Sequence, residues 1–114
     1  MSGKLSTHVL DTAMGRPAAG LKIQLWRIED NEPLLLKEAI TNWDGRTETP
    51  LLSGDELKPG VYELVFQVGR YFSETTEDAF LQDVPVRFRI LNPKENYHIP
   101  LLVSPWSYTT YRGS

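Results

Sequence analysis

Hydrophobic and polar residues alternate one by one along most of the chain, which is the pattern of strands that bury one face. The clearest run covers residues 61–68, where Tyr62, Leu64, Phe66 and Val68 share one side. Comparable runs predict the other strands. The expected strands cover residues 5–10, 21–28, 34–41, 61–68, 84–90, 97–103 and 106–111.

Turn signals separate these runs. Asp44-Gly45 is a tight-turn dipeptide, and Pro59-Gly60 combines a preset backbone angle with a residue that tolerates positive φ. Further turns are expected at residues 29–33 and 92–96. The short strands and frequent turns predict a mainly β fold, an antiparallel β-sandwich of seven to eight strands in a single domain over residues 1–114.

Two places depart from the alternation. Residues 73–82 lose the strand rhythm and begin with Ser73, a helix-capping residue, followed by acidic Glu74 and later by an apolar patch around Phe80. This order predicts the one short helix of the chain. Pro100 interrupts a strand pattern, and its missing N–H group predicts a bulge or interrupted pairing there.

Both histidines of the chain are expected on outward faces of strands. Because Leu5 and Val9 face the core in the first strand, His8 must point the other way. The same rule turns His98 outward in residues 97–103, together with apolar neighbours. An outward face that carries apolar residues predicts that another subunit covers this sheet.

Composition and charge exclude several classes of function. The 114 residues carry 12 basic and 15 acidic side chains, for a net charge of −3, which argues against a nucleic-acid partner. No apolar run approaches the roughly 18 residues of a membrane span, so no membrane partner is expected. There is no cysteine, and residues 1–4 lack the apolar region of a signal peptide. A cytoplasmic protein is expected.

Polar groups are concentrated at the last four residues, Tyr111, Arg112, Gly113 and Ser114. They follow a strand pattern and offer a phenol, a guanidinium, a bare backbone, a hydroxyl and a terminal carboxylate. Such a set could bind a small polar molecule, although a solvated sheet edge is the simpler interpretation. For Arg46, just after the Asp-Gly turn, the simpler interpretation is likewise a solvated charge.

Two signatures in this sequence resemble those of one known family. Residues 5–11 (LSTHVLD), with Gly15 and Pro17, are similar to the N-terminal signature of transthyretin-like proteins. Residues 97–102 (YHIPLL) and the terminal YRGS at 111–114 are similar to the C-terminal signature. The resemblance spans essentially the whole chain and implies the transthyretin-like β-sandwich.

The family has two branches, the hormone carrier transthyretin and the purine-pathway enzyme 5-hydroxyisourate hydrolase. Four features of this chain resemble the enzyme branch: His8, Arg46, His98 and the terminal residues 111–114. The carrier lacks these residues at the matching positions and continues past the tetrapeptide. The combination implies hydrolysis of 5-hydroxyisourate to 2-oxo-4-hydroxy-4-carboxy-5-ureidoimidazoline in urate degradation.

The resemblance also implies an assembly and a site. Family members form homotetramers, as dimers of dimers, whose stacked sheets leave a central channel for a purine-derived substrate. Residues at this channel are divided by role. The implied catalytic residues are His8, Arg46, His98 and Ser114, and the implied substrate-binding residues are His8, Arg46, His98, Tyr111, Arg112, Gly113 and Ser114.

Opening a ring amide needs an activated water and stabilisation of an oxyanion. Without cysteine or a clear catalytic triad, the chemistry expected here is metal-free general acid–base hydrolysis without a cofactor. His8 and His98 are both candidates for the base, because imidazole has a reference pKa of about 6.5. Arg46 can polarise the attacked carbonyl, and Arg112 offers a planar fork to substrate oxygens.

A non-catalytic binding module is the alternative function. Related sandwiches use the same turns as plain scaffold, and their outward faces bind a small ligand without chemistry. The joint presence of His8, Arg46, His98 and the tetrapeptide favours the enzyme, because a scaffold has no need of all four.

Overall fold

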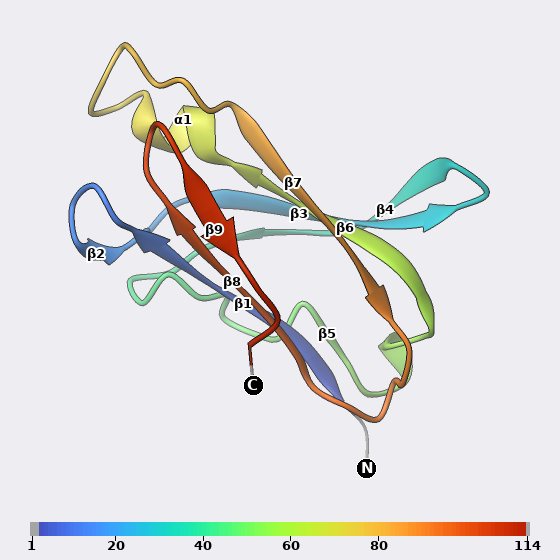
Figure 1. Ribbon diagram of the computed structural model, residues 1–114. Coiled ribbons are helices and arrows are strands. Elements are labelled where there is room, and N and C mark those ends of the chain that lie inside the picture. The colour runs from blue at the N-terminus through green and yellow to red at the C-terminus, as the bar shows by residue number, and fades with distance from the viewer. Residues whose placement is uncertain (1–2, 114) are drawn as a thin grey trace.

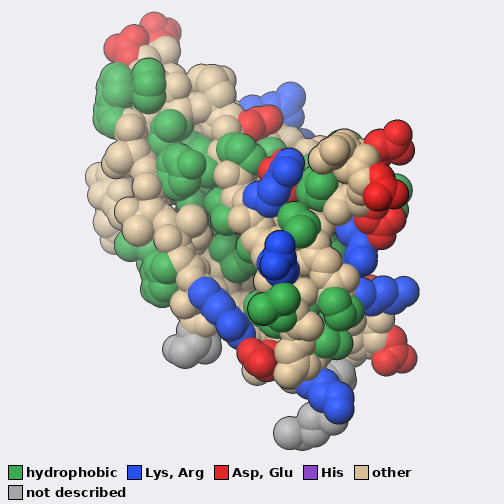
Figure 2. All heavy atoms as spheres, turned by 45° about the vertical axis from the view of Figure 1, so that its right-hand side comes forward, with side chains coloured by type: hydrophobic (Ala, Val, Ile, Leu, Met, Phe, Trp, Pro, Cys, Tyr) green, Lys and Arg blue, Asp and Glu red, His purple; other side chains and the backbone are tan. Residues whose placement is uncertain are grey.

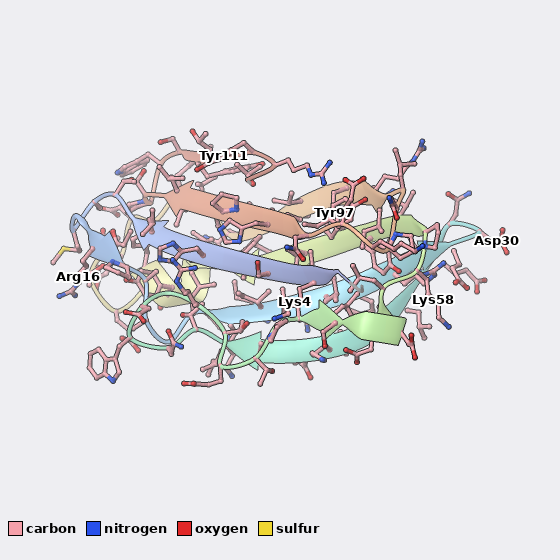
Figure 3. The ribbon with its side chains drawn as sticks, turned by 90° about the horizontal axis from the view of Figure 1, so that it is seen from below. Lys4, Arg16, Asp30, Lys58, Tyr97 and Tyr111 are labelled. Atoms are coloured by element: carbon pink, nitrogen blue, oxygen red, sulfur yellow. The ribbon has the colours of Figure 1, made fainter. Side chains whose placement is uncertain are left out.

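The computed structural model describes residues 3–113 as two β-sheets packed face to face (Figure 1). Seen from below, the sheets form separate layers, and the β3–β4 hairpin extends past them to Asp30 (Figure 3). The first sheet contains β1 (Lys4–Asp11), β2 (Arg16–Pro17), β5 (Leu52–Ser53), β8 (Tyr97–Val103) and β9 (Tyr108–Thr110). The second contains β3 (Lys22–Glu29), β4 (Glu32–Ile40), β6 (Gly60–Gln67) and β7 (Asp83–Ile90). This confirms the predicted sandwich.

The first sheet is organised around β1. Its neighbour β8 runs parallel to it, and the register is unbroken from Leu5 opposite Tyr97 to Asp11 opposite Val103. All other strand pairs are antiparallel. The one parallel pair departs from the antiparallel expectation, because β1 meets a strand from the far end of the chain instead of a hairpin partner.

The core lies between the inner faces of the two sheets, as the alternation predicted. Tyr62, Leu64, Phe66 and Val68 are all fully buried. Burial of each large apolar side chain contributes about 1.5–3 kcal/mol to stability. The opposite sheet contributes its own alternate residues. These are Leu5, Val9, Tyr97, Ile99, Leu101 and Val103, all buried.

The helix is displaced from its predicted position. α1 covers Val68–Phe72, and Ser73 is its C-cap, so the expectation of a helix over 73–82 is wrong. The Ser73 hydroxyl donates to the carbonyl of Arg70, which ends the helix instead of beginning one. The N–H groups of Phe80 and Leu81 then donate to a carbonyl of the β8–β9 connection. That tertiary contact uses the backbone groups that a helix would have needed.

The two helical segments of the described chain are short: α1 has five residues, and a 3-10 turn (Gly54–Glu56) has three. Within residues 3–113, no helix has the length and apolar character needed to cross a membrane.

The turn expected over residues 29–33 is tighter than predicted. β3 continues to Glu29 and β4 resumes at Glu32, so only Asp30 and Asn31 connect them. Both connecting residues have positive φ, 50° and 65°, as a two-residue hairpin requires. Pro33 lies inside β4, which is an edge strand of its sheet, where the missing N–H group is tolerated.

Pro100 interrupts pairing on one side of β8 only. Its register with β1 contains no bulge. On the other side, the pairing with β9 stops at Leu101 opposite Thr110 and returns as an isolated bridge between His98 and Gly113. The expected interruption is therefore found on the side of the terminal strand. The Pro100 side chain, predicted to face outward, is buried already in the single chain.

Candidate active site

The parallel pairing of β1 with β8 places both histidines on one side of the sheet. Ser6 lies opposite His98, and His8 lies opposite Pro100, two residues further along. Residues two apart on a strand share a face and are separated by roughly 6–7 Å. The buried residues of both strands occupy the other face, except Pro100, which is buried on the histidine side. The two imidazoles are thus neighbours on the outer side of the first sheet.

The turn at residues 42–46 packs directly against β1. Val9 donates its N–H to the carbonyl of Gly45 at 2.8 Å, and His8 Nε2 lies 2.7 Å from the carbonyl oxygen of Asp44. Gly45 has a φ of 76°, and a Cβ there would lie 2.3 Å from the Val9 oxygen. Only glycine allows this close approach. The Asp-Gly pair predicted the turn, and the structure adds the contact of the Asp44 carbonyl with His8.

Arg46 is carried to the histidines by the same turn. The Asn42 side-chain oxygen accepts hydrogen bonds from the N–H groups of Asp44 at 2.9 Å and Arg46 at 3.2 Å. These bonds fix the backbone, while the Arg46 side chain stays exposed. Its charge is close enough to act on His98, whose pKa it helps to lower.

The contact of His8 fixes the position of one proton. A carbonyl oxygen only accepts hydrogen bonds, so His8 Nε2 must carry the hydrogen that it shares with Asp44. In the neutral ring, Nδ1 of His8 is therefore the nitrogen with a free lone pair.

His98 has a different environment. Its Nδ1 lies 2.8 Å from the hydroxyl oxygen of Ser6, which can either donate or accept. Burial lowers the pKa of His98 below its usual value, and the positive charge of Arg46 and the nearby His8 lower it further. His98 therefore remains neutral at pH values where an ordinary histidine begins to take up a proton.

The described end of the chain lies on His98. Gly113 donates its N–H to the carbonyl of His98 at 2.7 Å. A Cβ at Gly113 would lie 2.8 Å from Cδ2 of the imidazole, so the bare backbone lies against the ring. Ser114, expected to contribute a hydroxyl and the terminal carboxylate, lies outside the described residues.

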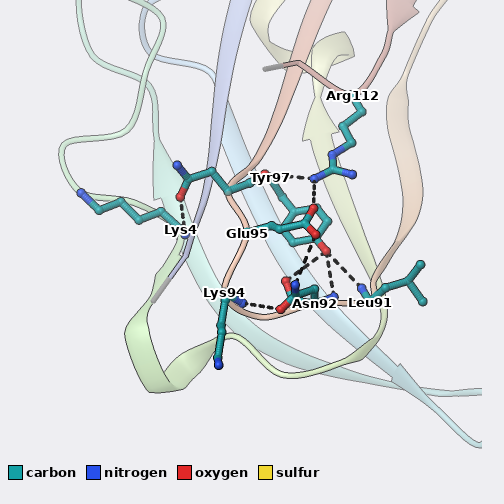
Figure 4. Close-up of polar contacts among 8 residues, drawn as sticks. Lys4, Leu91, Asn92, Lys94, Glu95, Tyr97 and Arg112 are labelled. Atoms are coloured by element: carbon teal, nitrogen blue, oxygen red, sulfur yellow. Dashed lines mark hydrogen bonds and ion pairs between the residues drawn. The ribbon is translucent and has the colours of Figure 1, made fainter. Parts of the chain in front are cut away.

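The side chain of Arg112 is not brought to the histidines. Its Nη2 donates to Glu95 Oε1 at 2.9 Å and to the carbonyl of Asn96 at 3.3 Å, and its guanidinium carbon lies 4.4 Å from the ring centre of Tyr97 (Figure 4). Tyr97 is a core residue, so Arg112 reaches toward the inner side of the sheet. Tyr111 is 57% exposed.

Arg112 and Tyr111 instead line a second hollow, between β7 and the strands β8 and β9. Its volume is about 280 Å³, and Val86, Phe88 and Ile99 contribute apolar walls. Figure 2 shows hydrophobic side chains gathered on this side of the molecule, with Lys and Arg side chains beside them. This hollow is separate from the surface that carries the histidines.

Sequence patterns alone did not single out three groups that contact the predicted site residues: the Ser6 hydroxyl, the Asp44 carbonyl and the Glu95 carboxylate. Ser6 could have been found only by knowing that β1 pairs with β8 in parallel. Among residues 3–113, no three His, Asp or Glu side chains come together as a group that could hold a metal ion.

The arrangement combines complementary chemical abilities. A neutral imidazole can accept a proton from water, and a permanently charged guanidinium can stabilise an oxyanion. Both groups stand on a rigid sheet or on a turn bonded to it. The site can therefore support hydrolysis of a small polar molecule.

Proteins of known sequence or structure that resemble this chain include hydrolases. A 5-hydroxyisourate hydrolase of Halalkalibacterium halodurans is 53% identical over 119 aligned positions that cover both chains completely. A solved (S)-allantoin synthase is 47% identical with a TM-score of 0.91, over 99% of this chain and 44% of that one. Sea bream transthyretin, solved in complex with thyroxine, is 25% identical with a TM-score of 0.89, over 96% of this chain and 94% of that one.

The family model described as the HIUase/Transthyretin family matches residues 5–113. That match includes every strand of both sheets except the first residue of β1. The chain belongs to the HIUase/Transthyretin family.

Proposed function

We propose that this chain is a 5-hydroxyisourate hydrolase of urate degradation, which opens a ring amide of its substrate to give 2-oxo-4-hydroxy-4-carboxy-5-ureidoimidazoline. The observation that carries the proposal is the grouping of His8, His98 and the Arg46 turn on one outer face. The full-length match at 53% identity to a hydrolase of that name supports the same reaction.

In this proposal His98 is the general base. Its pKa is lowered by burial and by the nearby charges, so the ring is neutral and ready to take a proton. Nε2 of His98 accepts a proton from water while the oxygen of that water attacks the ring carbonyl. The C–N bond then breaks, and the leaving nitrogen takes up a proton, which leaves a carboxylate and a ureido group.

Ser6 holds His98 for this task. When the hydroxyl accepts the hydrogen of Nδ1, the lone pair of the neutral ring is on Nε2, the nitrogen farther from β1. The 2.8 Å contact between Ser6 and Nδ1 is compatible with this tautomer, which the proposal adopts. Ser6 is thus proposed as a positioning residue, and not as a nucleophile.

Arg46 and His8 act on the substrate. The guanidinium of Arg46 stabilises the negative charge that develops on the attacked carbonyl oxygen. His8, whose Nε2 hydrogen is held by Asp44, has Nδ1 available to bind or protonate a substrate nitrogen. Gly113 lets backbone approach the substrate, and Ser114 is proposed to orient the water or a histidine. Tyr111, expected in the binding set, lines the separate hollow beside β7 and is proposed here only as support for the chain end. No metal or cofactor takes part.

The proposed assembly is a homotetramer, a dimer of dimers, in which the outer faces of the first sheets stack over the substrate. Leu10 and Leu102 stand opposite each other in the register of β1 and β8, so the histidine surface has apolar members that a partner could cover. Light scattering of the purified protein tests the mass. A cytoplasmic location remains a prediction that cell fractionation can check.

The decisive experiment follows the absorbance of freshly made urate oxidase product with and without the protein. We expect the protein to accelerate loss of the 5-hydroxyisourate signal, and the His98→Asn variant to accelerate it far less. Unchanged decay with the wild-type protein would instead support a non-catalytic binding module. The higher identity to the hydrolase than to the thyroxine-bound transthyretin favours catalysis.

A further inference from the structure

The last described strand segment has two sides with different contacts. Gly113 lies against the imidazole of His98 on the outer side of the sheet. The preceding residue, Arg112, extends to the inner side, where it meets Glu95, the Asn96 carbonyl and the Tyr97 ring. Successive residues of an extended segment point to opposite sides, so one backbone connects both sets of contacts.

The contacts of Arg112 come from a part of the chain that is itself well anchored. Tyr97 is 5% exposed, and its hydroxyl accepts the N–H groups of Leu91 and Asn92 at 3.2 and 3.0 Å. Glu95 accepts a hydrogen bond from the Asn92 side chain as well as from Arg112. The β7–β8 turn thus offers a fixed platform for the guanidinium (Figure 4).

We propose that Arg112 is an anchor for the end of the chain, held by Glu95 and Tyr97, and that Glu95 is a positioning residue of the active site. Held in this way, the anchor keeps Gly113 on His98. The inference rests on the proposed hydrolase function. It replaces the expectation that the Arg112 side chain binds substrate directly.

Pinning Arg112 restricts its immediate neighbour. The backbone between the Arg112 side chain and Gly113 is a single peptide unit, which moves by at most a few ångströms once the guanidinium is fixed. Gly113 in turn covers the Cδ2 edge of His98 and bonds its carbonyl. If the anchor is released, His98 gains solvent while Arg46 and His8, the other charged or titratable groups that act on it, stay in place.

Glu95 gives a test that separates anchoring from direct substrate binding. If Arg112 binds substrate, Glu95 competes for its guanidinium, and the Glu95→Gln variant should bind substrate as well or better. If Arg112 is an anchor, the Glu95→Gln and Arg112→Gln variants should have the same kind of defect, because each breaks the Arg112–Glu95 contact. Arg112→Gln should have the larger defect, because it also removes the contacts with the Asn96 carbonyl and the Tyr97 ring.

The experiment measures kcat and KM for Glu95→Gln, Arg112→Gln and the double variant, each shown to keep the assembly of the wild-type protein. We expect Glu95→Gln to lower kcat/KM about 3-fold, as for loss of one exposed ion pair. Arg112→Gln, which also loses the Tyr97 ring contact, should lower it up to about 10-fold. The double variant should be no worse than Arg112→Gln alone. Additive losses, or a Glu95→Gln variant with normal or improved KM, would overturn the proposal.

Glu63→Gln is the matched control. Glu63 also forms an ion pair with an arginine, Arg87, at 3.1 Å, but on the outer side of the second sheet. Its loss should leave kcat/KM and the acid limb of the activity profile unchanged. The Arg112→Lys variant, which keeps the charge without the planar fork, should recover part of the activity.

Hydrogen exchange at the Gly113 amide gives a readout that needs no substrate. This N–H is bonded to the His98 carbonyl, so release of the anchor should speed its exchange. The pKa of His98, followed by its ring proton resonances, should rise toward the usual value in Glu95→Gln. Unchanged exchange and an unchanged pKa would refute the anchor even if the protein proved not to hydrolyse 5-hydroxyisourate.

Discussion

At the scale of single residues, the two histidines differ in what holds them. His8 donates to a backbone carbonyl, whereas His98 contacts a hydroxyl that can exchange roles with it. The carbonyl contact fixes the tautomer of neutral His8, whereas the hydroxyl contact permits either tautomer of His98. A ring that must gain and lose a proton during catalysis benefits from the second kind of partner, which supports His98 as the base.

The pH dependence follows from the lowered pKa of His98. Because burial, Arg46 and His8 all disfavour the protonated ring, the acid limb of kcat/KM should lie below pH 6.5. The same shift makes the folded protein lose stability as pH falls through the unfolded value near 6.5, since the unfolded chain then binds the proton more readily. A pH profile with a limb above 6.5, in protein that keeps its assembly, would argue against His98.

Ser6→Ala should lower kcat more than it raises KM. The variant removes the hydroxyl that holds Nδ1 of His98, and a single hydrogen bond of this kind contributes about 0.5–1.5 kcal/mol, or roughly 2- to 10-fold in rate. Ser6→Thr keeps the hydroxyl and is the matched control. Steady-state kinetics of both variants test the role, and equal activity of Ser6→Ala and wild type would remove it.

At the scale of elements, the site depends on how closely the turn at residues 42–46 approaches β1. Gly45→Ala should lower the free energy of unfolding by about 1–3 kcal/mol, because the residue has positive φ and a Cβ would overlap the Val9 oxygen. The turn must then move, and Arg46 and the Asp44 carbonyl move with it. We expect at least a tenfold fall in kcat/KM, measured beside urea unfolding.

Gly15→Ala is the control for that variant. Gly15 also has positive φ, 69°, but its added Cβ would meet nothing within 4 Å. The Gly15→Ala variant should therefore lose stability through backbone strain, while its kcat/KM stays normal. If Gly45→Ala kept normal turnover, the close docking of the turn would not matter for catalysis.

The elements also show what the sequence could and could not predict. The alternation located the strands, and the buried side of those that bury one face, because such burial imposes a period of two. The edge strand β4 has no buried residue and alternates only weakly. The helix was misplaced, since Ser73 looks like a cap in sequence but ends a helix that starts at Val68. The direction of Arg112 could not be predicted either, because it depends on the distant turn that holds Glu95.

At the scale of the whole molecule, the two histidines, the Arg46 turn and Gly113 come from four separate parts of the chain. The sequence identified these residues through the combined signature, and the structure gives their contacts. Their catalytic roles remain predictions. The tetramer belongs to the same scale, because its proposed channel would need outer faces of more than one subunit.

A C-terminal extension should abolish most of the activity and leave the melting temperature nearly unchanged. Gly113 already lies on the His98 ring, so added residues would be attached one residue beyond this contact and would crowd the histidine surface. Of the described residues, 111–113 are not part of the buried core. Untagged and N-terminally tagged proteins are the controls, and full turnover in the extended form would contradict the assigned role of the chain end.

The parallel pairing of β1 with β8 has a consequence for synthesis. The hydrogen-bonded residues Ser6 and His98 are 92 positions apart, so β1 cannot pair with β8 until most of the chain has been synthesised. Contacts of such high contact order form late, because a long loop must close before they are gained. The second sheet can pair its hairpins earlier. On the ribosome, the catalytic face is therefore expected to be the last part of the protein to assemble, and a nascent chain stays inactive until β8 emerges.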